Sequence, residues 1–334
     1  MIKQSDIAKK LNISRTTVGR ALNDTGSISI DTKEKILKTC KELGYKKNPI
    51  STSLALKKKK NIYAFIVRTK KDYYINQIKL GFLKAQNEFK FYKYEINIIE
   101  TKIDCPEVQL EQLKKIIDKR DVDGIIITPL LKDEISNIRK NNPQIFFMAL
   151  DLKLDNNTYN IYSNYHKSGR VTAEVLQNLL NNNDNILLID TEDDRISSKL
   201  LYDGFYEKIE EDKKCNIVGP IYQSDLQNNI SVVIDKNLNE NIKAIYSSRF
   251  LDDIVNYIYE NNQIDLKVVG NGLENKMKKL IKDNKIVATI AEPYLDLGYL
   301  VCKSMFEYLY KGVEPKYKNI KLESEIVFRE NLLG

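Results

Sequence analysis

The sequence is short of the side chains that build metal centres and disulfides. It has one histidine, His166, and four cysteines far apart with no Cys-x-x-Cys pair: Cys40, Cys105, Cys215 and Cys302. A structural zinc needs several such ligands at close spacing, and a disulfide framework needs paired cysteines. We therefore expect no metal site, no disulfide and no cofactor. Because His166 lacks acid–base partners, we expect it at the surface or in a helix cap.

Long apolar runs and enzyme motifs are also missing. No run of about 18 apolar residues occurs, and the first residues contain no apolar stretch of the kind found in signal peptides. We therefore expect a cytoplasmic protein without a membrane partner. The chain has no P-loop, no GxSxG and no GxGxxG motif, so nothing predicts an enzyme.

The charge that is present is divided unevenly. Apolar residues make up 42% of the 334 residues and charged residues 30%, which suits a globular chain of two or three compact units. Residues 1–60 hold 15 Lys+Arg against 5 Asp+Glu, whereas the rest carries a net charge of about −3. A basic head on a slightly acidic body is typical of nucleic-acid binding, and a merely soluble basic terminus is the alternative.

The apolar spacing in the head predicts three short helices around one small core. The predicted caps and ends are Ser5 and Asn12 for the first helix, Ser14 and residues 23–26 for the second, and Ser29 or Asp31 and Gly44 for the third. The third helix is expected to bury Ile36, Leu37, Cys40 and Leu43. Two short helices joined by a three-residue turn form a helix-turn-helix, whose second helix enters the major groove of DNA.

The first residues of that second helix suit base reading. Arginine can donate two parallel hydrogen bonds to guanine, and threonine offers a hydroxyl and a methyl group to a thymine. The residues concerned are Ser14, Arg15, Thr16, Thr17 and Arg20.

The segment IKQSDIAKKLNISRTTVGRALNDTGSISIDTKEKILKTCKELGYKKNP, residues 2–49, resembles the DNA-binding head of the LacI/GalR repressor family. The resemblance continues without gaps through Tyr45 and Asn48, and it implies that Ser5 and Asn23 also belong to the DNA-binding set. Gly19 departs from it, since the family usually has serine there. A glycine inside a helix costs ~1 kcal/mol relative to alanine.

Residues 48–60 follow the head, and the resemblance implies a hinge helix there that forms on the operator. Pro49 suits a first helical turn, while Ser51 and its hydroxyl-bearing neighbours make the isolated helix weak. Leu54 stands where the family inserts a leucine wedge into the minor groove. The alternative is that Leu54 packs on the body as part of a linker. The lysines from Lys57 to residue 60 either form a solvated linker or bind phosphates.

The body alternates apolar runs with amphipathic stretches, which predicts parallel sheets covered by helices. Strands are expected at 62–67, 94–99, 124–128, 145–149, 186–189, 217–221, 244–246 and 267–269, and helices at 74–89 and 106–119. So many strands require two doubly wound lobes with a cleft at the carboxyl ends of the strands. This body resembles the periplasmic-binding-protein-like effector domain of the same family.

The predicted organisation is a small all-α helix-turn-helix domain followed by α/β. The head covers 1–47, the hinge 48–60 and the body 61–334. The resemblance implies three crossings between the lobes, which we place near 160, 290 and 320. The N-lobe is then about 61–160 plus 291–320, and the C-lobe about 161–290 plus 321–334.

The resemblance also implies an effector site in the cleft. Its expected residues are Asp72, Tyr73, Tyr74, Asp151, Arg195, Arg249, Asn271 and Glu292. Aromatic side chains would stack on the C–H faces of a sugar, and carboxylates would accept from its hydroxyls. The family pattern is altered, because Leu201 and Gly272 replace an arginine and an aspartate, and Arg249 with the residue after it replaces an Asn-Asp pair. Each expected cleft residue has ordinary loop polarity as its alternative.

These features predict a sequence-specific transcription regulator, a repressor by resemblance, which binds a palindromic DNA operator as a homodimer and lies on the nucleoid when bound. Its effector is expected to be a sugar or sugar phosphate, with nucleosides, other polar metabolites and no ligand as alternatives. Residues 331–334 are too short for a tetramerising tail, which favours a dimer. The competing classes are a solute-binding protein, a doubly wound enzyme and a regulator that has lost effector control. The first would need a signal sequence and no basic head, and the second a phosphate loop.

Overall fold

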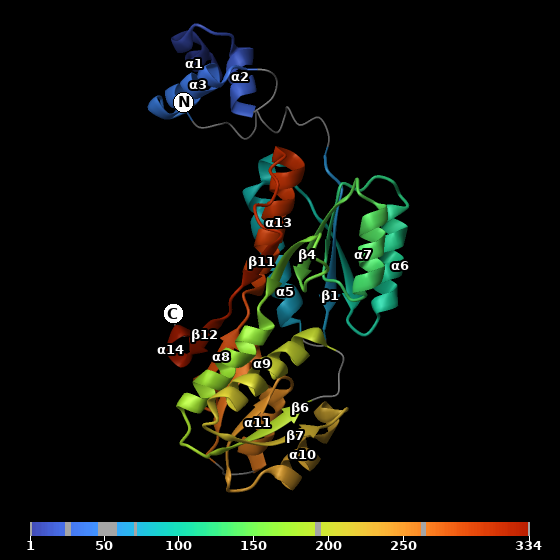
Figure 1. Cartoon of the computed structure of the whole chain (residues 1–334), viewed down its shortest axis with the longest axis vertical. Coiled ribbons are helices and arrows are strands. Elements are labelled where there is room, and N and C mark those ends of the chain that lie inside the picture. The colour runs from blue at the N-terminus through green and yellow to red at the C-terminus, as the bar shows by residue number, and fades with distance from the viewer. Residues whose placement is uncertain are drawn as a thin grey trace. The chain divides into compact units, whose positions relative to one another are not determined.

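The computed structural model describes residues 2–23, 28–45, 59–69, 72–190, 195–261 and 265–332. The chain divides into a helical head and a larger α/β body that begins at Lys60 (Figure 1). The predicted DNA-binding residues Asn48, Ser51, Leu54 and Lys57 lie outside the described residues, as does the side chain of Asn23. Across the described ranges, no helix combines the length and the apolar character needed to cross a bilayer.

The head consists of α1 (Gln4–Leu11), α2 (Arg15–Asn23) and α3 (Ile30–Glu42). Its core is formed by Ile7, Ala8, Val18, Ala21, Ile36 and Cys40. The predicted turn between α1 and α2 is confirmed. Asn12 takes a left-handed conformation (φ 52°), Ile13 N–H donates to Ala8 C=O at 3.0 Å, and Ser14 Oγ caps α2 by accepting from Thr17 N–H at 3.0 Å.

The start of α1 differs from the prediction, because Ser5 is not its cap. The helix begins at Gln4, and Lys3 is the residue at its N-terminal boundary. The Asp6 carboxylate reaches back and accepts from Lys3 N–H at 2.8 Å, so a first-turn acid satisfies the end of the helix. Ser5 therefore lies inside the first turn.

The boundaries of α3 were predicted correctly. Ser29 Oγ accepts from Thr32 N–H at 3.3 Å, which decides between the two possible caps, and Gly44 follows the helix with φ 62°. One core position was wrong, since Leu37 is 46% exposed. It lies one residue past Ile36, about 100° around a helix of 3.6 residues per turn, and therefore points away from the core.

The first lobe of the body is a parallel sheet in the order β11-β5-β4-β3-β1-β2. Helices α6 and α7 cover one face of the sheet, and α5 and α13 cover the other (Figure 1). The strands are β1 (Ile62–Arg68), β2 (Asn97–Lys102), β3 (Gly124–Ile127), β4 (Phe146–Asp151), β5 (Tyr159–Ser163) and β11 (Asn319–Leu322). The helices are α5 (Tyr73–Glu88), the 3-10 turn η1 (Lys90–Tyr92), α6 (Pro106–Ile117), α7 (Lys132–Asn141) and α13 (Tyr294–Lys311).

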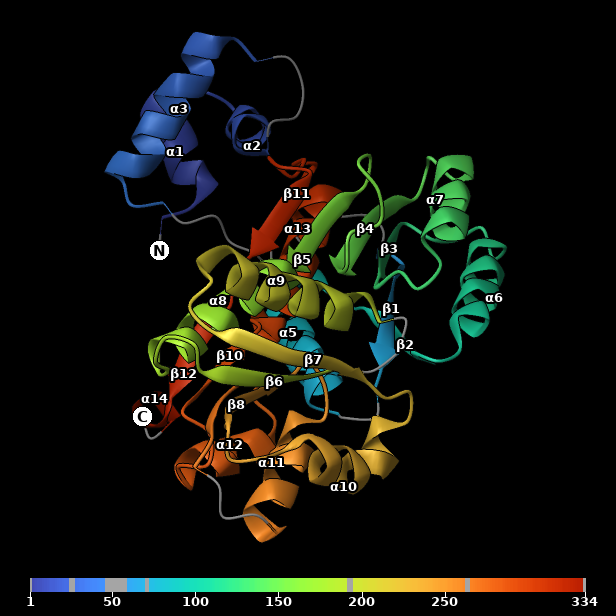
Figure 2. The ribbon, with the colours of Figure 1, turned by 60° about the horizontal axis from the view of Figure 1, so that its bottom comes forward.

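The second lobe repeats this plan with the order β12-β10-β9-β8-β6-β7. Its strands are β6 (Asn185–Asp190), β7 (Asn216–Tyr222), β8 (Ile242–Ser247), β9 (Lys267–Asn271), β10 (Ala288–Ala291) and β12 (Glu325–Phe328). Helices α8 (Tyr165–Asn178) and α9 (Ile196–Asp212) cover one face, and α10 (Leu226–Asn237), α11 (Leu251–Asn261) and α12 (Asn275–Lys282) cover the other (Figure 2). The short helix α14 (Arg329–Leu332) follows β12. The predicted pair of doubly wound lobes is confirmed, with one exception: β12 pairs antiparallel to β10.

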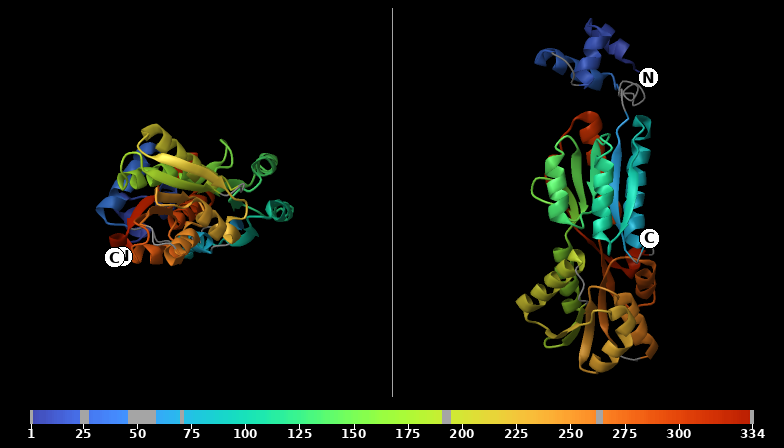
Figure 3. Two further views of the ribbon diagram at one scale, coloured as in Figure 1. Left: turned by 90° about the horizontal axis from the view of Figure 1, so that it is seen from below. Right: turned by 90° about the vertical axis from the view of Figure 1, so that its right-hand side faces the viewer.

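The chain crosses between the lobes three times in the body (Figure 3). The crossings follow β5, β10 and β11, at Asn164, at Glu292 with Pro293, and at Glu323 with Ser324. Each lies a few residues beyond the position placed from the sequence. Because β5 and β11 pair in the first sheet, the first lobe extends to Ser163 and to Leu322.

Four glycines bring two pairs of helices close together. A Cβ on Gly81 of α5 would lie 2.2 Å from Leu295 C=O of α13, and one on Gly298 would lie 2.4 Å from Ile78 C=O. In the other lobe, a Cβ on Gly204 of α9 would lie 1.9 Å from His166 C=O of α8. Gly169 of α8 makes the reciprocal approach to Leu201. The helices that begin at two of the crossings, α8 and α13, are thus fixed tightly to their own lobes.

Candidate functional site

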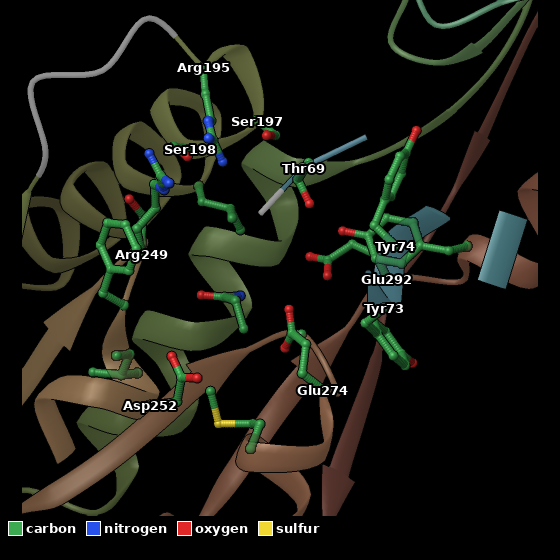
Figure 4. A pocket seen from close by; sticks show the side chains of 18 of the residues that line it. Thr69, Tyr73, Tyr74, Arg195, Ser197, Ser198, Arg249, Asp252, Glu274 and Glu292 are labelled. Carbon is green, nitrogen blue, oxygen red and sulfur yellow. The ribbon is translucent and has the colours of Figure 1, made fainter. Parts of the chain in front are cut away.

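The body contains a cavity of about 820 Å³ at the carboxyl ends of strands from both sheets (Figure 4). In a doubly wound sheet this edge is where ligands bind, because loops and helix N-termini converge there. All eight residues expected in the effector site line the cavity: Asp72, Tyr73, Tyr74, Asp151, Arg195, Arg249, Asn271 and Glu292. They come from both lobes and line one cavity, as the sequence analysis expected. Their contacts with a ligand stay a prediction.

Asp151 ends β4 in a strained conformation. Its φ is 65°, and Leu152 N–H donates to Leu150 C=O at 2.7 Å across it, which closes a γ-turn. Only 6% of the residue is exposed, and Tyr165 OH donates to Oδ1 at 2.7 Å. Burial raises the pKa of this carboxyl to about 6, although hydrogen bonds from Tyr165 and Tyr74 oppose the rise. A strained, buried carboxylate of this kind is typical of a functional position.

Four tyrosines line the cavity near its carboxylates, and we call them the tyrosine cluster: Tyr73, Tyr74, Tyr165 and Tyr294. The ring of Tyr294 packs edge to face with two other rings. Its centroid lies 4.9 Å from that of Tyr74 and 6.4 Å from that of Tyr73. The hydroxyls of Tyr165 and Tyr294 lie 3.4 Å apart. The cluster therefore offers both apolar ring surface and hydroxyl groups to a ligand.

Glu292 follows β10 at the second crossing and is 6% exposed. Its Oε1 is buried and has no hydrogen-bond partner among the residues that the structure describes. Burial is the main cause that raises the pKa of Glu292, to about 8, and the negative charges of Asp151 and Glu274 raise it further. Figure 4 shows the carboxylates of Glu292 and Glu274 pointing toward the same part of the cavity. We call Asp151, Glu274 and Glu292 the acidic end of the pocket.

Two arginines lie in a different part of the cavity. Arg195 precedes α9 and Arg249 precedes α11, and Figure 4 shows their side chains close together, away from Glu292. Burial lowers the pKa of both guanidinium groups, and the negative charge of Asp104 opposes this. The Arg249 guanidinium lies 4.6 Å from the centre of the Phe250 ring. The pocket therefore has a cationic end as well as an acidic end.

Asn271 forms hydrogen bonds with two other side chains of the protein. Its Oδ1 accepts from Tyr246 OH at 2.9 Å, and its Nδ2 donates to Thr172 Oγ1 at 3.0 Å. Part of its hydrogen-bonding capacity is thus used to fix β9 against α8. It lines the cavity as expected, but it has less to offer a ligand than Asp151 or Glu292.

Of the pocket residues that sequence reasoning left out of its site, three belong to the acidic end or the tyrosine cluster. They are Tyr165, Glu274 and Tyr294. Tyr165 and Tyr294 begin the helices that directly follow two crossings, and the approximate positions of those crossings were available from the sequence. Leu201, where the family has an arginine, lines the cavity and is 7% exposed. No group of side chains with metal-ligand geometry occurs among the residues described.

The second candidate site is the first part of α2 in the head. Arg15, Thr16 and Arg20 are exposed on α2, as an interface with DNA requires. Ser14 and Thr17 differ from them, because Ser14 Oγ and Thr17 Oγ1 lie 2.8 Å apart and share a hydrogen bond in the cap. Their hydroxyls therefore form the cap at the start of the helix.

The remaining predicted head contacts are placed as follows. Tyr45 is half-buried and packs against the core of the head, while its N–H donates to Cys40 C=O at 2.9 Å. Ser5 is half-buried, and its hydroxyl lies 3.5 Å from Asp6 Oδ1. These positions leave their DNA contacts as predictions.

Comparison with known proteins finds a family match for the head and another for the body. Residues 4–48 match the family described as bacterial regulatory proteins, lacI family, and residues 63–312 match the periplasmic binding protein domain. The chain is 25% identical, over 98% of both chains, to the HTH-type transcriptional regulator RegA of Clostridium saccharobutylicum.

Two solved structures share the fold of the body. One is a putative LacI transcriptional regulator from Bacteroides fragilis, with a TM-score of 0.70 and 16% identity over 82% of this chain and 99% of that one. The other is an ABC transporter solute-binding protein from Burkholderia graminis in complex with D-arabinose, with a TM-score of 0.69 and 17% identity over 83% of this chain and 98% of that one.

Proposed function

The chain belongs to the lacI family of bacterial regulatory proteins, with a periplasmic-binding-protein domain behind its DNA-binding head, and we propose that it is a repressor released from its operator by a carbohydrate-like effector. The observation that supports an effector is the cavity lined by polar and aromatic side chains from both lobes. A ligand that contacts both lobes favours one lobe arrangement, which is how binding in the body can change DNA binding.

The DNA-binding part of the proposal rests on the exposed arginines of α2. We infer that Arg15 and Arg20 contact base edges or phosphates in the major groove, and that two heads of a homodimer read the two halves of a palindrome. Acting on chromosomal DNA requires a cytoplasmic location. The hinge contacts expected for Ser51 and Leu54 would complete the interface in the minor groove.

The effector part of the proposal rests on the division of the pocket into an acidic end and a cationic end. Hydroxyls of a ligand would donate to Asp151 and Glu292, and its C–H faces would pack on the tyrosine cluster. Arg195 and Arg249 would donate to hydroxyl or phosphate oxygens at the other end. The coupling between effector and operator is expected to be ~1–3 kcal/mol, as in other allosteric proteins.

The test uses the full-length protein. Selection from random duplexes should first yield a palindromic operator. Thermal unfolding with a metabolite panel should then find an effector, since a ligand at about 100 times its Kd adds ~2.7 kcal/mol of stability. The effector should lower the affinity for the operator. Specific operator binding that no member of the panel changes would favour a regulator without effector control. That alternative is supported by Leu201, which stands in the pocket where the family has an arginine. No preference for any duplex would contradict the proposed function itself.

A further inference from the structure

The acidic end of the pocket combines a buried acceptor, unsatisfied by the described residues, with clustered negative charge, which a neutral ligand does not neutralise. We propose that the effector carries a primary amine, with an aminated sugar as its chemical class, and that the ammonium group binds among Glu292, Glu274 and Asp151. This inference rests on the proposed effector function and specifies the ligand of that same pocket.

Glu292 is the first support for an amine. Within the described ranges its Oε1 is buried without a hydrogen-bond partner, although the residue lines the cavity. A buried acceptor left unsatisfied is costly, so it points to a donor that comes from outside the protein. A hydroxyl group brings one donor, whereas an ammonium group brings three together with a positive charge.

The charges around Glu292 are the second support. The charged neighbours that shift its pKa are acids, Asp151 and Glu274, and both raise it. Two basic residues among the described part of the pocket wall are engaged with another acid or placed away from Glu292. Lys276 Nζ forms an ion pair with Asp253 Oδ1 at 2.7 Å, and Arg249 lies at the cationic end. Glu292 and its two acidic neighbours repel one another when they are charged, and a bound cation converts that repulsion into attraction.

The tyrosine cluster is the third support. The rings of Tyr73, Tyr74 and Tyr294 pack edge to face around the acidic end, so ring surface and carboxylates meet in one place. Aromatic faces attract cations and also pack on the C–H faces of a sugar ring. An aminated sugar uses both kinds of contact, whereas a simple alkylamine leaves the rest of the large cavity without hydroxyl partners.

The test compares ligands that differ only at one group. Glucosamine, galactosamine and mannosamine are each paired with the parent hexose and with the N-acetyl derivative, in which the positive charge is removed. Binding to the full-length protein is measured by calorimetry at pH 7. At least one amine should bind about tenfold or more tightly than both of its partners, as expected for a charged hydrogen bond in a buried site.

A matched pair of variants locates the contact. Glu292→Gln keeps the size of the side chain but removes its charge, and it should reduce amine binding by about tenfold or more, a clearly larger loss than it causes for the parent hexose, which would lose only a neutral contact. Glu211→Gln makes the same chemical change on exposed α9, where Glu211 is paired with Arg170 outside the cavity. It should leave the preference for the amine unchanged.

Several results would overturn the inference without touching the proposed function. One is a hexose or N-acetyl derivative that binds as tightly as its amine. Another is equal loss of both ligand types in Glu292→Gln. A third is failure of all three amines to bind a protein that still selects its operator. Failure to select any operator would instead count against the proposed function.

Discussion

Tyr165 OH donates to Asp151 Oδ1 at 2.7 Å, and this hydrogen bond joins the two lobes next to the first crossing. Asp151 ends β4 of one sheet, while Tyr165 begins α8, which packs in the other lobe. The bond is buried at both ends, since the two residues are 6% and 4% exposed. It therefore holds the carboxylate that faces the pocket and ties it to the helix that would move with the second lobe.

Removing this donor should make stability more sensitive to pH. The folded-state pKa of Asp151 is about 6, above the ordinary value of 3.8, so stability is lost as pH rises through that range. In Tyr165→Phe the pKa should rise further, because a hydrogen bond that favours the charged form is gone. We expect the variant to be less stable than the wild type by ~1–3 kcal/mol at pH 8, with little of this difference at pH 5.

Thermal unfolding of the full chain at the two pH values measures this difference. Tyr162→Phe in β5 is the matched control, because the Tyr162 hydroxyl makes no hydrogen bond with the residues that the structure describes. An equal loss of stability at pH 5 and pH 8 in Tyr165→Phe would mean that packing alone is responsible.

Glu292 should produce a pH effect of its own in the ligand-free protein. Its folded-state pKa is about 8 and its ordinary value 4.5, so the wild type loses stability as pH rises from about 4.5 through about 8. The titratable groups that face it include Asp151, Glu274, Tyr165 and Tyr294, and the charges of the two acids add to the effect of burial.

Glu292→Gln removes that titration and should flatten the stability curve. Relative to the wild type, the variant should gain stability between pH 5 and pH 9, at ~1.4 kcal/mol for each unit by which the pKa is raised, as an upper bound. Chemical denaturation across this range, without ligand, measures the change. Parallel curves for the two proteins would show that Glu292 is not the titrating group.

The sequence was most informative where periodicity and local chemistry agree. The turn at Asn12 and the caps at Ser14 and Ser29 follow from side chains that bond to the nearest backbone, so short-range reasoning finds them. Strands such as 62–67 are continuous apolar runs because helices cover both faces, and they were placed to within a residue or two.

Elements that depend on distant partners were harder to predict. The second strand begins at Asn97 rather than at Tyr94, because Tyr94 is buried beside α13 and its OH donates to Cys302 C=O at 2.7 Å. Strand β11 is short, and the one strand that it pairs with among the described residues is β5, which lies more than 150 residues earlier in the chain. The pocket was hard to predict for the same reason, because Tyr74 and Tyr294 are far apart in the sequence and come into contact only in the folded chain.

Gly19 lies inside α2 with room for a larger side chain. A Cβ there would meet only Gln4 Oε1, at an ordinary 3.7 Å. Gly19→Ala should therefore stabilise the head by ~0.5–1 kcal/mol, because glycine loses more backbone entropy in a helix. Amide hydrogen exchange of the head in the full chain measures this. Gly204→Ala is the contrasting control, because its Cβ would overlap His166 C=O and should destabilise the body.

Removing Arg15 from α2 and removing the lysines at 57–59 should have different effects on DNA binding. Arg15 is exposed on α2, and Arg15→Ala should relax base preference at one position of each half-site by ~1–3 kcal/mol. Replacing residues 57–59 by serine should instead weaken binding to all sequences alike. The slope of affinity against salt concentration, on logarithmic axes, should then fall by ~1 for each phosphate that is no longer neutralised.

Lys60 should be left in place in that experiment. Its Nζ forms an ion pair with Asp123 Oδ1 at 2.8 Å, and its N–H lies 3.3 Å from Tyr310 OH, so it anchors the entry to β1. Arg15→Lys serves as the control for charge, since it keeps the positive charge but loses the two-pronged geometry. If Arg15→Ala lowered affinity equally for operator and scrambled duplex, Arg15 would be a phosphate contact and the base reading would have to come from Thr16 or Arg20.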